Sequence, residues 1–172
     1  MSYLFENQNP AVMANGFNTN KDVALGGALS VTGATTHTGS IASASSIKSS
    51  SATAGVGYAT GAGAAVTQIT NRSTGVTVQG VCGTIQTDTT SLAAGASAEF
   101  TVTNASVAIG DVVIVSQRSG SSTVAGVAGT TIVEVVTVAA GSFIISINNN
   151  SSTTAETGAI IINFAVIKAV AA

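Results

Sequence analysis

Hydrophobic and polar residues alternate in short runs over residues 64–172, which is the pattern of β-strands with one buried face. Turn-forming clusters of Gly, Asn, Asp and Ser separate these runs at intervals of about 8–12 residues. We therefore predict seven or eight strands, at residues 65–70, 75–81, 83–87, 98–104, 111–117, 131–138, 142–148 and 159–170. The residues predicted to face the core are Phe100, Val102, Phe143, Ile145, Ile147, Ile160, Ile162, Phe164 and Val166.

This spacing of strands and turns is typical of a β-sandwich or a jelly roll, so the predicted fold class is all-β. Two of the predicted strands are apolar on both faces: the one that begins at Asp111 and the last one, at 159–170. Strands of this kind need cover on both sides. A neighbouring subunit or an N-terminal arm would supply that cover.

Residues 1 to about 63 have a different character, with few bulky apolar residues and much Gly, Ala, Ser, Thr and Asn. Such a segment cannot bury enough apolar surface to form a core of its own. We therefore divide the chain into an extended N-terminal arm at 1–54 and a β-sandwich domain at 55–172. The arm is predicted to dock in a neighbour's groove, and the alternative is a leader without fixed structure. Its predicted docking residues are Tyr3, Leu4, Phe5, Val12, Met13 and Phe17.

A strand-like pattern recurs within the arm, where Leu29 and Val31 alternate with small residues and Gly33 and Gly39 follow. This segment resembles the G-x-L-x-V-T-G units of phage tail-fibre and head-appendage shafts, in which short strands from three chains wind together. The resemblance covers about 20 residues and implies a homotrimer. The predicted shaft residues are Leu29, Val31, His37 and Ile41.

The composition changes this picture in one respect, because only 7% of the residues are charged, against about 25% in typical globular proteins. Exposed helices are normally rich in Glu, Lys and Arg, so the deficit also favours an all-β fold. So few charges promote association, which favours an oligomer over a soluble domain coated with Ser and Thr. The net charge of −2 and the absence of a basic cluster predict no binding to nucleic acid or anionic lipid.

Neither a membrane span nor a secretion signal is expected. The longest apolar stretch, residues 159–172, contains Asn163 and Lys168 and is shorter than the roughly 20 residues of a span. The first ten residues, MSYLFENQNP, lack a basic start and an apolar segment. With Cys82 as the single cysteine, we expect synthesis in a reducing cytoplasm.

The candidates for chemistry lack the partners that each chemistry needs. The glycines at 55, 57 and 61 have no strand before them and no helix after them, as a dinucleotide loop requires. Residues 45–48 match S-x-x-K without its companion motifs. One histidine, His37, and one cysteine cannot make a typical zinc site, although a His37 ring around a threefold axis is an alternative ion site.

Nucleophilic and acid–base catalysis are not indicated either. Cys82 has no activating neighbour and is expected to act as a small apolar residue. The remaining carboxylates fall in separate turns or strands, without the aromatic platforms of sugar-cleaving sites. They are Asp88, Glu99, Asp111, Glu134 and Glu156. We therefore predict no enzyme activity, no catalytic residue, no metal and no cofactor.

The C-terminal portion resembles a module of tailed-bacteriophage virion proteins. The resemblance is carried by GVGYATGAGAAVTQITNRSTGVTVQGVCGTIQT, by LAAGASAEFTVTNASVAIGDVVIVS and by AIIINFAVIKAVAA, over about residues 55–172. Capsid decoration proteins, head fibres and some tail appendages carry such modules, and no catalytic residue belongs to the resemblance.

Three functions follow from these patterns. The first is a trimeric capsid decoration, or cement, protein on the outer shell of the virion, made in the bacterial cytoplasm, whose arm staples major capsid subunits. The second is a head or tail fibre that binds a host-surface glycan through loops at 117–129 and 148–158. The third is a carbohydrate-active enzyme. It is the least favoured of the three, because so few charged residues leave few pairs whose pKa values could be tuned for catalysis.

Overall fold

Two units separate along the chain in the computed structural model, Met1–Lys48 and Ser49–Ala172. The structure describes residues 31–39, 41, 43, 44, 46–53, 55–59, 61–119 and 131–169. The regular secondary structure in this part of the chain is entirely β, so the predicted all-β class is confirmed. The division at 54/55 stays a prediction.

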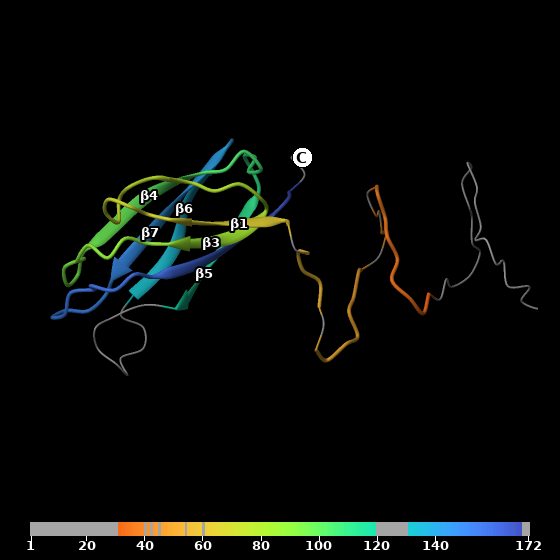
Figure 1. The fold of residues 1–172 in the computed structure, drawn as a ribbon, viewed down its shortest axis with the longest axis horizontal. Helices are drawn as coiled ribbons and strands as arrows, with labels where there is room; N and C mark the ends of the chain where they lie inside the picture. Colours follow the sequence, from red (N-terminus) through yellow and green to blue (C-terminus); the bar gives the residue numbers. More distant parts are fainter. Residues whose placement is uncertain are drawn as a thin grey trace, which may run out of the picture. The chain divides into compact units, whose positions relative to one another are not determined.

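The described residues of the second unit form eight strands, one at each predicted position (Figure 1). The second strand is much shorter than its predicted range of 75–81, because only two of its residues pair with another strand. The strands are β1 (Gly63–Thr67), β2 (Val76–Thr77), β3 (Cys82–Gln86), β4 (Ser97–Thr103), β5 (Val112–Ser119), β6 (Thr131–Ala139), β7 (Ser142–Asn149) and β8 (Ile161–Ile167).

These strands form two four-stranded sheets, with the orders β1-β3-β8-β5 and β2-β4-β7-β6. The sheets share one hydrophobic core and are not closed into a barrel, which is a sandwich-like arrangement. Strands of one sheet run obliquely to those of the other (Figure 1). From β1 to β6 successive strands alternate between the sheets, so β1, β3 and β5 lie in one sheet and β2, β4 and β6 in the other.

Two strand pairs are parallel, β1 with β3 and β2 with β4. Each pair is joined by a connection that passes through the opposite sheet, whereas a tight hairpin can join only antiparallel strands. Among the eight strands, β6 and β7 are the one consecutive pair joined as neighbours, through Ala140 and Gly141, whose φ is +78°. A jelly roll is antiparallel throughout, and the two parallel pairs depart from that part of the prediction.

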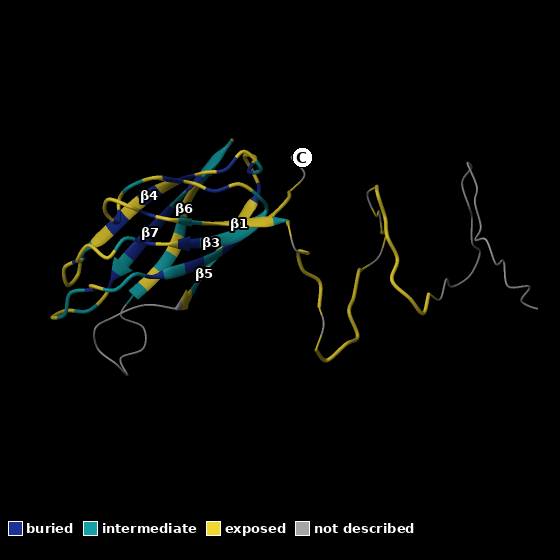
Figure 2. Cartoon of the chain, viewed as in Figure 1, coloured by how far each residue is buried: buried dark blue, intermediate teal, exposed yellow. Residues whose placement is uncertain are grey.

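The core lies between the sheets and contains all nine residues predicted to face it. Each large aliphatic side chain in such a core stabilises the fold by about 1.5–3 kcal/mol. Phe143 of β7 and Phe164 of β8 join the two layers, with ring centroids 5.6 Å apart. Figure 2 shows buried and exposed positions alternating along the strands, as the period of two requires.

Glycine permits an unusually close approach between β1 and β3. A Cβ at Gly63 would lie 2.5 Å from the Cys82 carbonyl oxygen. A Cβ at Gly83 would collide with the Ala64 carbonyl oxygen and would lie 2.7 Å from the Phe164 ring. Glycine is therefore required at 63 and 83 for packing, and no sequence pattern indicates this requirement.

The described residues from 31 to 59 contrast with the β-domain. All of them are exposed, and none lies in a strand (Figure 2). The strand pattern predicted around Val31 is therefore not realised at residues 31–39 of the single chain, where no second strand pairs with it. A shaft built from three chains stays a prediction.

Candidate interaction surfaces

The outer surface of sheet β1-β3-β8-β5 follows from the alternation of β8. Ile162, Phe164 and Val166 point into the core, so Ile161, Asn163, Ala165 and Ile167 occupy the outer side. Strand pairing extends this side into two apolar rows, Gly63–Cys82–Ala165–Ile114 and Ile167–Val112. We name this surface, with the outward residues Ala65, Thr84 and Ser116, the neutral face.

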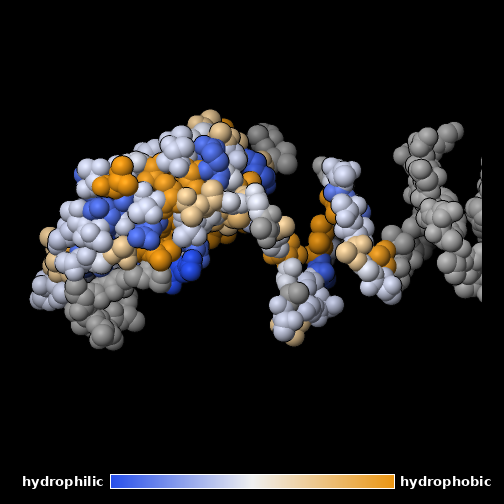
Figure 3. Space-filling model, in the orientation of Figure 1, coloured by the Kyte–Doolittle hydropathy of each residue, from blue (hydrophilic) through white to orange (hydrophobic). Residues whose placement is uncertain are grey.

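Large aliphatic side chains are exposed on the neutral face. Val112 is 52% exposed, and Ile114 and Ile167 are each 50% exposed. Arg118 is the only charged residue in the four strands, and it is exposed at the end of β5 beside an irregular step in the pairing. Figure 3 shows hydrophobic surface between hydrophilic patches on the β-domain. A face of this kind is typical of a surface that contacts another molecule.

The outer surface of sheet β2-β4-β7-β6 is acidic. Glu99 of β4 and Glu134 of β6 both pair with Ser146 of β7, which places the two carboxylates on one row of the sheet. They are the only charged residues in these four strands. Glu134 Oε1 accepts a hydrogen bond of 2.9 Å from Asn148 Nδ2. We name this surface, with the exposed Ile132 and Val136 and the half-buried Ile144, the acidic face.

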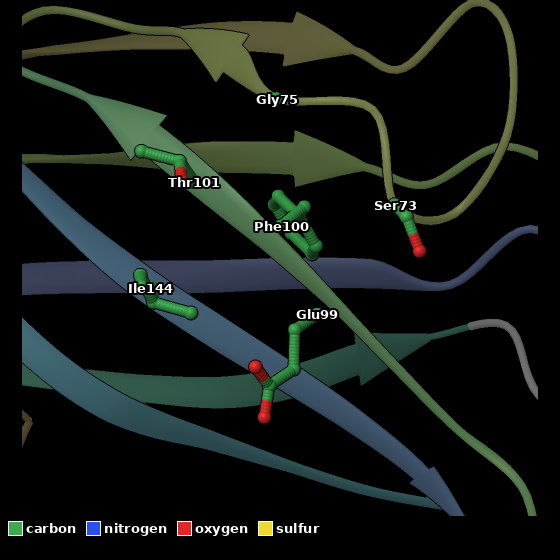
Figure 4. Close-up of a pocket in the computed structure, with 6 residues that line it drawn as sticks. All are labelled: Ser73, Gly75, Glu99, Phe100, Thr101 and Ile144. Atoms are coloured by element: carbon green, nitrogen blue, oxygen red, sulfur yellow. The ribbon is translucent and has the colours of Figure 1, made fainter.

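A hollow of about 290 Å³ opens on the acidic face. Figure 4 shows Glu99 and Ile144 projecting from neighbouring strands, with Ser73 on the loop before β2. The lining residues are Ser73, Gly75, Glu99, Phe100, Thr101 and Ile144. One carboxylate beside apolar groups suits a cationic group carried on an aliphatic stem.

A buried polar cluster holds together the loops at one end of the sandwich. Arg72 is 3% exposed and donates from Nε to the Thr90 carbonyl (2.5 Å) and from Nη2 to the Gly158 carbonyl (2.6 Å). Glu156, 1% exposed, accepts hydrogen bonds from Thr131 Oγ1 (2.9 Å) and from the Gly158 amide (3.0 Å). Burial lowers the pKa of Arg72, and the charge of Glu156 opposes that effect. Being closed to solvent, the cluster joins loops and offers no substrate site.

The sequence pattern predicts Glu156 to be an acid in a turn and indicates no role for Arg72. Both residues lie in polar loops, where charged residues are usually exposed. Their burial depends on loops 68–75, 87–92 and 149–158 folding over them, and no local pattern signals it.

The other described acids serve as local structural anchors. Asp111 forms an ion pair with Lys168, and its carboxylate also accepts hydrogen bonds from the amides of Ala108 (2.8 Å) and Ala169 (3.1 Å). The hydrogen bond from Lys168 is the largest cause of the lowered pKa of Asp111, followed by that from Ala108. Hydrogen bonds from the side chain and amide of Thr90 lower the pKa of Asp88.

The predicted docking and shaft residues fall in two groups. The docking residues and Leu29 lie outside the described residues. Val31, His37 and Ile41 are described and exposed. Cys82 is a half-buried free thiol on the neutral face.

Within the described ranges, no group of three or more His, Cys, Asp or Glu residues is arranged to hold a metal ion. The same part of the chain contains no helix long and apolar enough to cross a membrane. Comparison of the chain with protein-family models, with curated proteins and with solved structures gives no match.

Proposed function

We propose that this protein is a non-enzymatic structural subunit of a bacteriophage virion, a capsid decoration protein that forms homotrimers. Its N-terminal arm docks on the outer surface of the shell and staples neighbouring major capsid subunits. The β-domain is a sandwich that assembles with its own copies. The resemblances of residues 27–39 and 55–172 to virion proteins support a place for this protein on a bacteriophage particle.

The observation that carries the proposal is the exposure of aliphatic side chains before β1, the first strand. Val31, Ile41, Ile47 and Val56 are 52%, 60%, 65% and 80% exposed. They occur in a segment whose described residues form neither strand nor helix and carry almost no charge. Burying these side chains against another molecule would remove apolar surface from water and so would stabilise the segment.

The proposed mechanism is cumulative weak binding. Each large apolar side chain that the arm buries on the shell contributes about 1.5–3 kcal/mol before the cost of ordering the arm. Three arms joined in one trimer bind with a high effective concentration. The trimer would thereby link several coat subunits and strengthen the shell.

A fibre that binds a host-surface glycan is the second candidate, and one loop favours it. Asn149 Nδ2 donates to the carbonyls of Leu92, Ala93 and Thr154, at 3.1, 3.1 and 2.9 Å. These bonds fix the 149–158 loop while Ser152 and Thr153 stay exposed. Fixed hydroxyl groups are suitable donors and acceptors for a sugar.

Deletion of residues 1–20 tests the arm. We expect the truncated chain to lose co-sedimentation with capsids that lack the protein, while its thermal unfolding midpoint stays unchanged. A full-length variant with Tyr3, Leu4, Phe5, Val12, Met13 and Phe17 changed to serine controls for chain length. Decoration of capsids by the truncated chain would contradict the proposal.

Cryo-electron microscopy of the intact particle separates the two candidates. Copies spread over the whole shell favour a decoration protein. A few copies at a vertex or on the tail, together with a glycan-array signal that is lost on changing Ser152 and Thr153 to alanine, favour the fibre.

A further inference from the structure

The two outer faces of the β-domain are complementary in charge. Arg118 is the only charged residue in the strands of the neutral face, and Lys168, which follows Ile167, is already paired with Asp111. The acidic face carries two carboxylates, Glu99 and Glu134. Arg118 forms no ion pair with either carboxylate within the chain, since the pair between Lys168 and Asp111 is the only one among the described residues. Opposite charges are thus presented separately, on different sheets.

The apolar groups of the two faces are also complementary. Val112, Ile114 and Ile167 are exposed on the neutral face, and Ile132 and Val136 on the acidic face. Two neutral faces packed together would leave the carboxylates without cations. Two acidic faces packed together would place like charges opposite one another, which opposes association. Only a contact between unlike faces joins apolar groups and matches the charges.

We propose that the neutral face of one copy packs on the acidic face of the next, with Arg118 entering the hollow beside Glu99. Ile144 lines that hollow and would contact the aliphatic stem, while Glu99 would pair with the guanidinium. Glu134 is less suited to this role, because it already binds Asn148.

A contact between two different faces has a consequence for symmetry. It is heterologous, so each copy offers one face to each of two neighbours. Such an assembly closes into a ring when the rotations between successive copies add up to a full turn, and otherwise continues as a filament. A ring of three satisfies both faces of every copy and agrees with the proposed homotrimer, on which this inference rests. The contact would also reach the loop that carries Arg72, because Ser73 of that loop lines the hollow.

Charge reversal in the full chain tests the pairing by sedimentation velocity over a range of concentrations. We expect a trimer for the natural sequence. Arg118→Glu and Glu99→Arg should each weaken association about tenfold or more at every contact. The double variant should restore the trimer, because the pair is re-formed with its signs exchanged.

Matched variants separate the interface from general effects of charge. Ile114→Lys, on the neutral face, should dissociate the trimer, whereas Ile47→Lys, at an exposed position outside both sheets, should not. Lys48→Glu is the control for reversing a cation. Arg118→Gln is a second test in case the Arg118→Glu variant fails to fold. It removes the positive charge without adding a negative one, and it should also weaken the trimer.

The outcomes are distinct. A monomer at all concentrations, or a trimer indifferent to Arg118, Glu99 and Ile114, overturns this interface, and the second result leaves the proposed docking on capsids standing. Dissociation by both single variants without rescue in the double variant also overturns the pairing. A trimer that responds as expected and fails to bind capsids supports the interface and contradicts the decoration function.

Discussion

The described residues 31–59 and the β-domain use the same kind of sequence with opposite results. Both are rich in Ser, Thr, Ala and Gly and poor in charge. Ile41 and Ile47 are nevertheless more than half exposed, whereas Ile85, Ile145 and Ile162 are fully buried. Hydrophobic residues alone therefore do not produce a core, and their repetition at strand period decides whether one forms.

The physical reason is cumulative. Ordering one residue costs about 1–2 kcal/mol of backbone entropy, which is comparable to the gain from burying one large aliphatic side chain. In the β-domain every second residue of several strands adds to the same core, and two sheets cover each other. Around Ile41 and Ile47 the neighbours are small, so no comparable core offsets the cost of ordering.

The largest expected effect comes from the centre of that core. Phe143→Ala removes a ring that is fully buried against Phe164, so we expect a loss of about 3–5 kcal/mol in the free energy of unfolding. Ile47→Ala, in the exposed segment, should change it by less than about 0.5 kcal/mol. Urea unfolding measures both, and equal losses would show that the two regions are not different in kind.

The second effect tests the loop cluster. Glu156→Gln keeps the shape but removes the charge near buried Arg72, and we expect a loss of about 1.5–3 kcal/mol. Glu134→Gln is the matched control, since the exposed Glu134 should tolerate the change within about 0.5 kcal/mol. Urea unfolding of the two variants gives the comparison, and a neutral Glu156→Gln would mean that the charge does not stabilise these loops.

The third effect tests close packing by glycine. Gly83→Ala forces a Cβ against the Ala64 carbonyl and the Phe164 ring, which should cost about 1–3 kcal/mol. Gly39→Ala meets nothing within 4 Å and should be nearly neutral. Thermal unfolding of both variants measures the difference, and an unchanged midpoint for Gly83→Ala would show that β1 and β3 can separate without cost.

The smallest effect is a dependence on pH at the end of β8. The pKa of Asp111 in the folded chain is below its unfolded value of about 3.9, so the native state binds fewer protons there. Its contribution is present above pH ~3.9 and is lost as the pH falls through the folded pKa. We expect Asp111→Asn to flatten the fall in the unfolding midpoint below pH ~3.9. An unaltered acid profile in this variant would assign that fall to other carboxylates, such as Asp88.

The candidate surfaces followed from sequence only in part. The two-sided apolar pattern of the segments around Val113 and Phe164 indicated that a second face needs cover, and Val112, Ile114 and Ile167 are indeed exposed on it. The acidic face was not predictable, because Glu99 and Glu134 are far apart in sequence and meet through β7. The cluster of Arg72 and Glu156 likewise required three loops to come together.

By itself the sequence determined where the strands of the β-domain lie and which of their faces is buried. Successive side chains of a strand point to opposite faces, so alternating apolar and polar residues show which face is buried. The tertiary structure alone decided the order of the strands, the two parallel pairs and the burial of Arg72 and Glu156. These features depend on contacts between residues distant in sequence. Local patterns carry no information about such partners, and only the packing of both sheets around a shared core selects them.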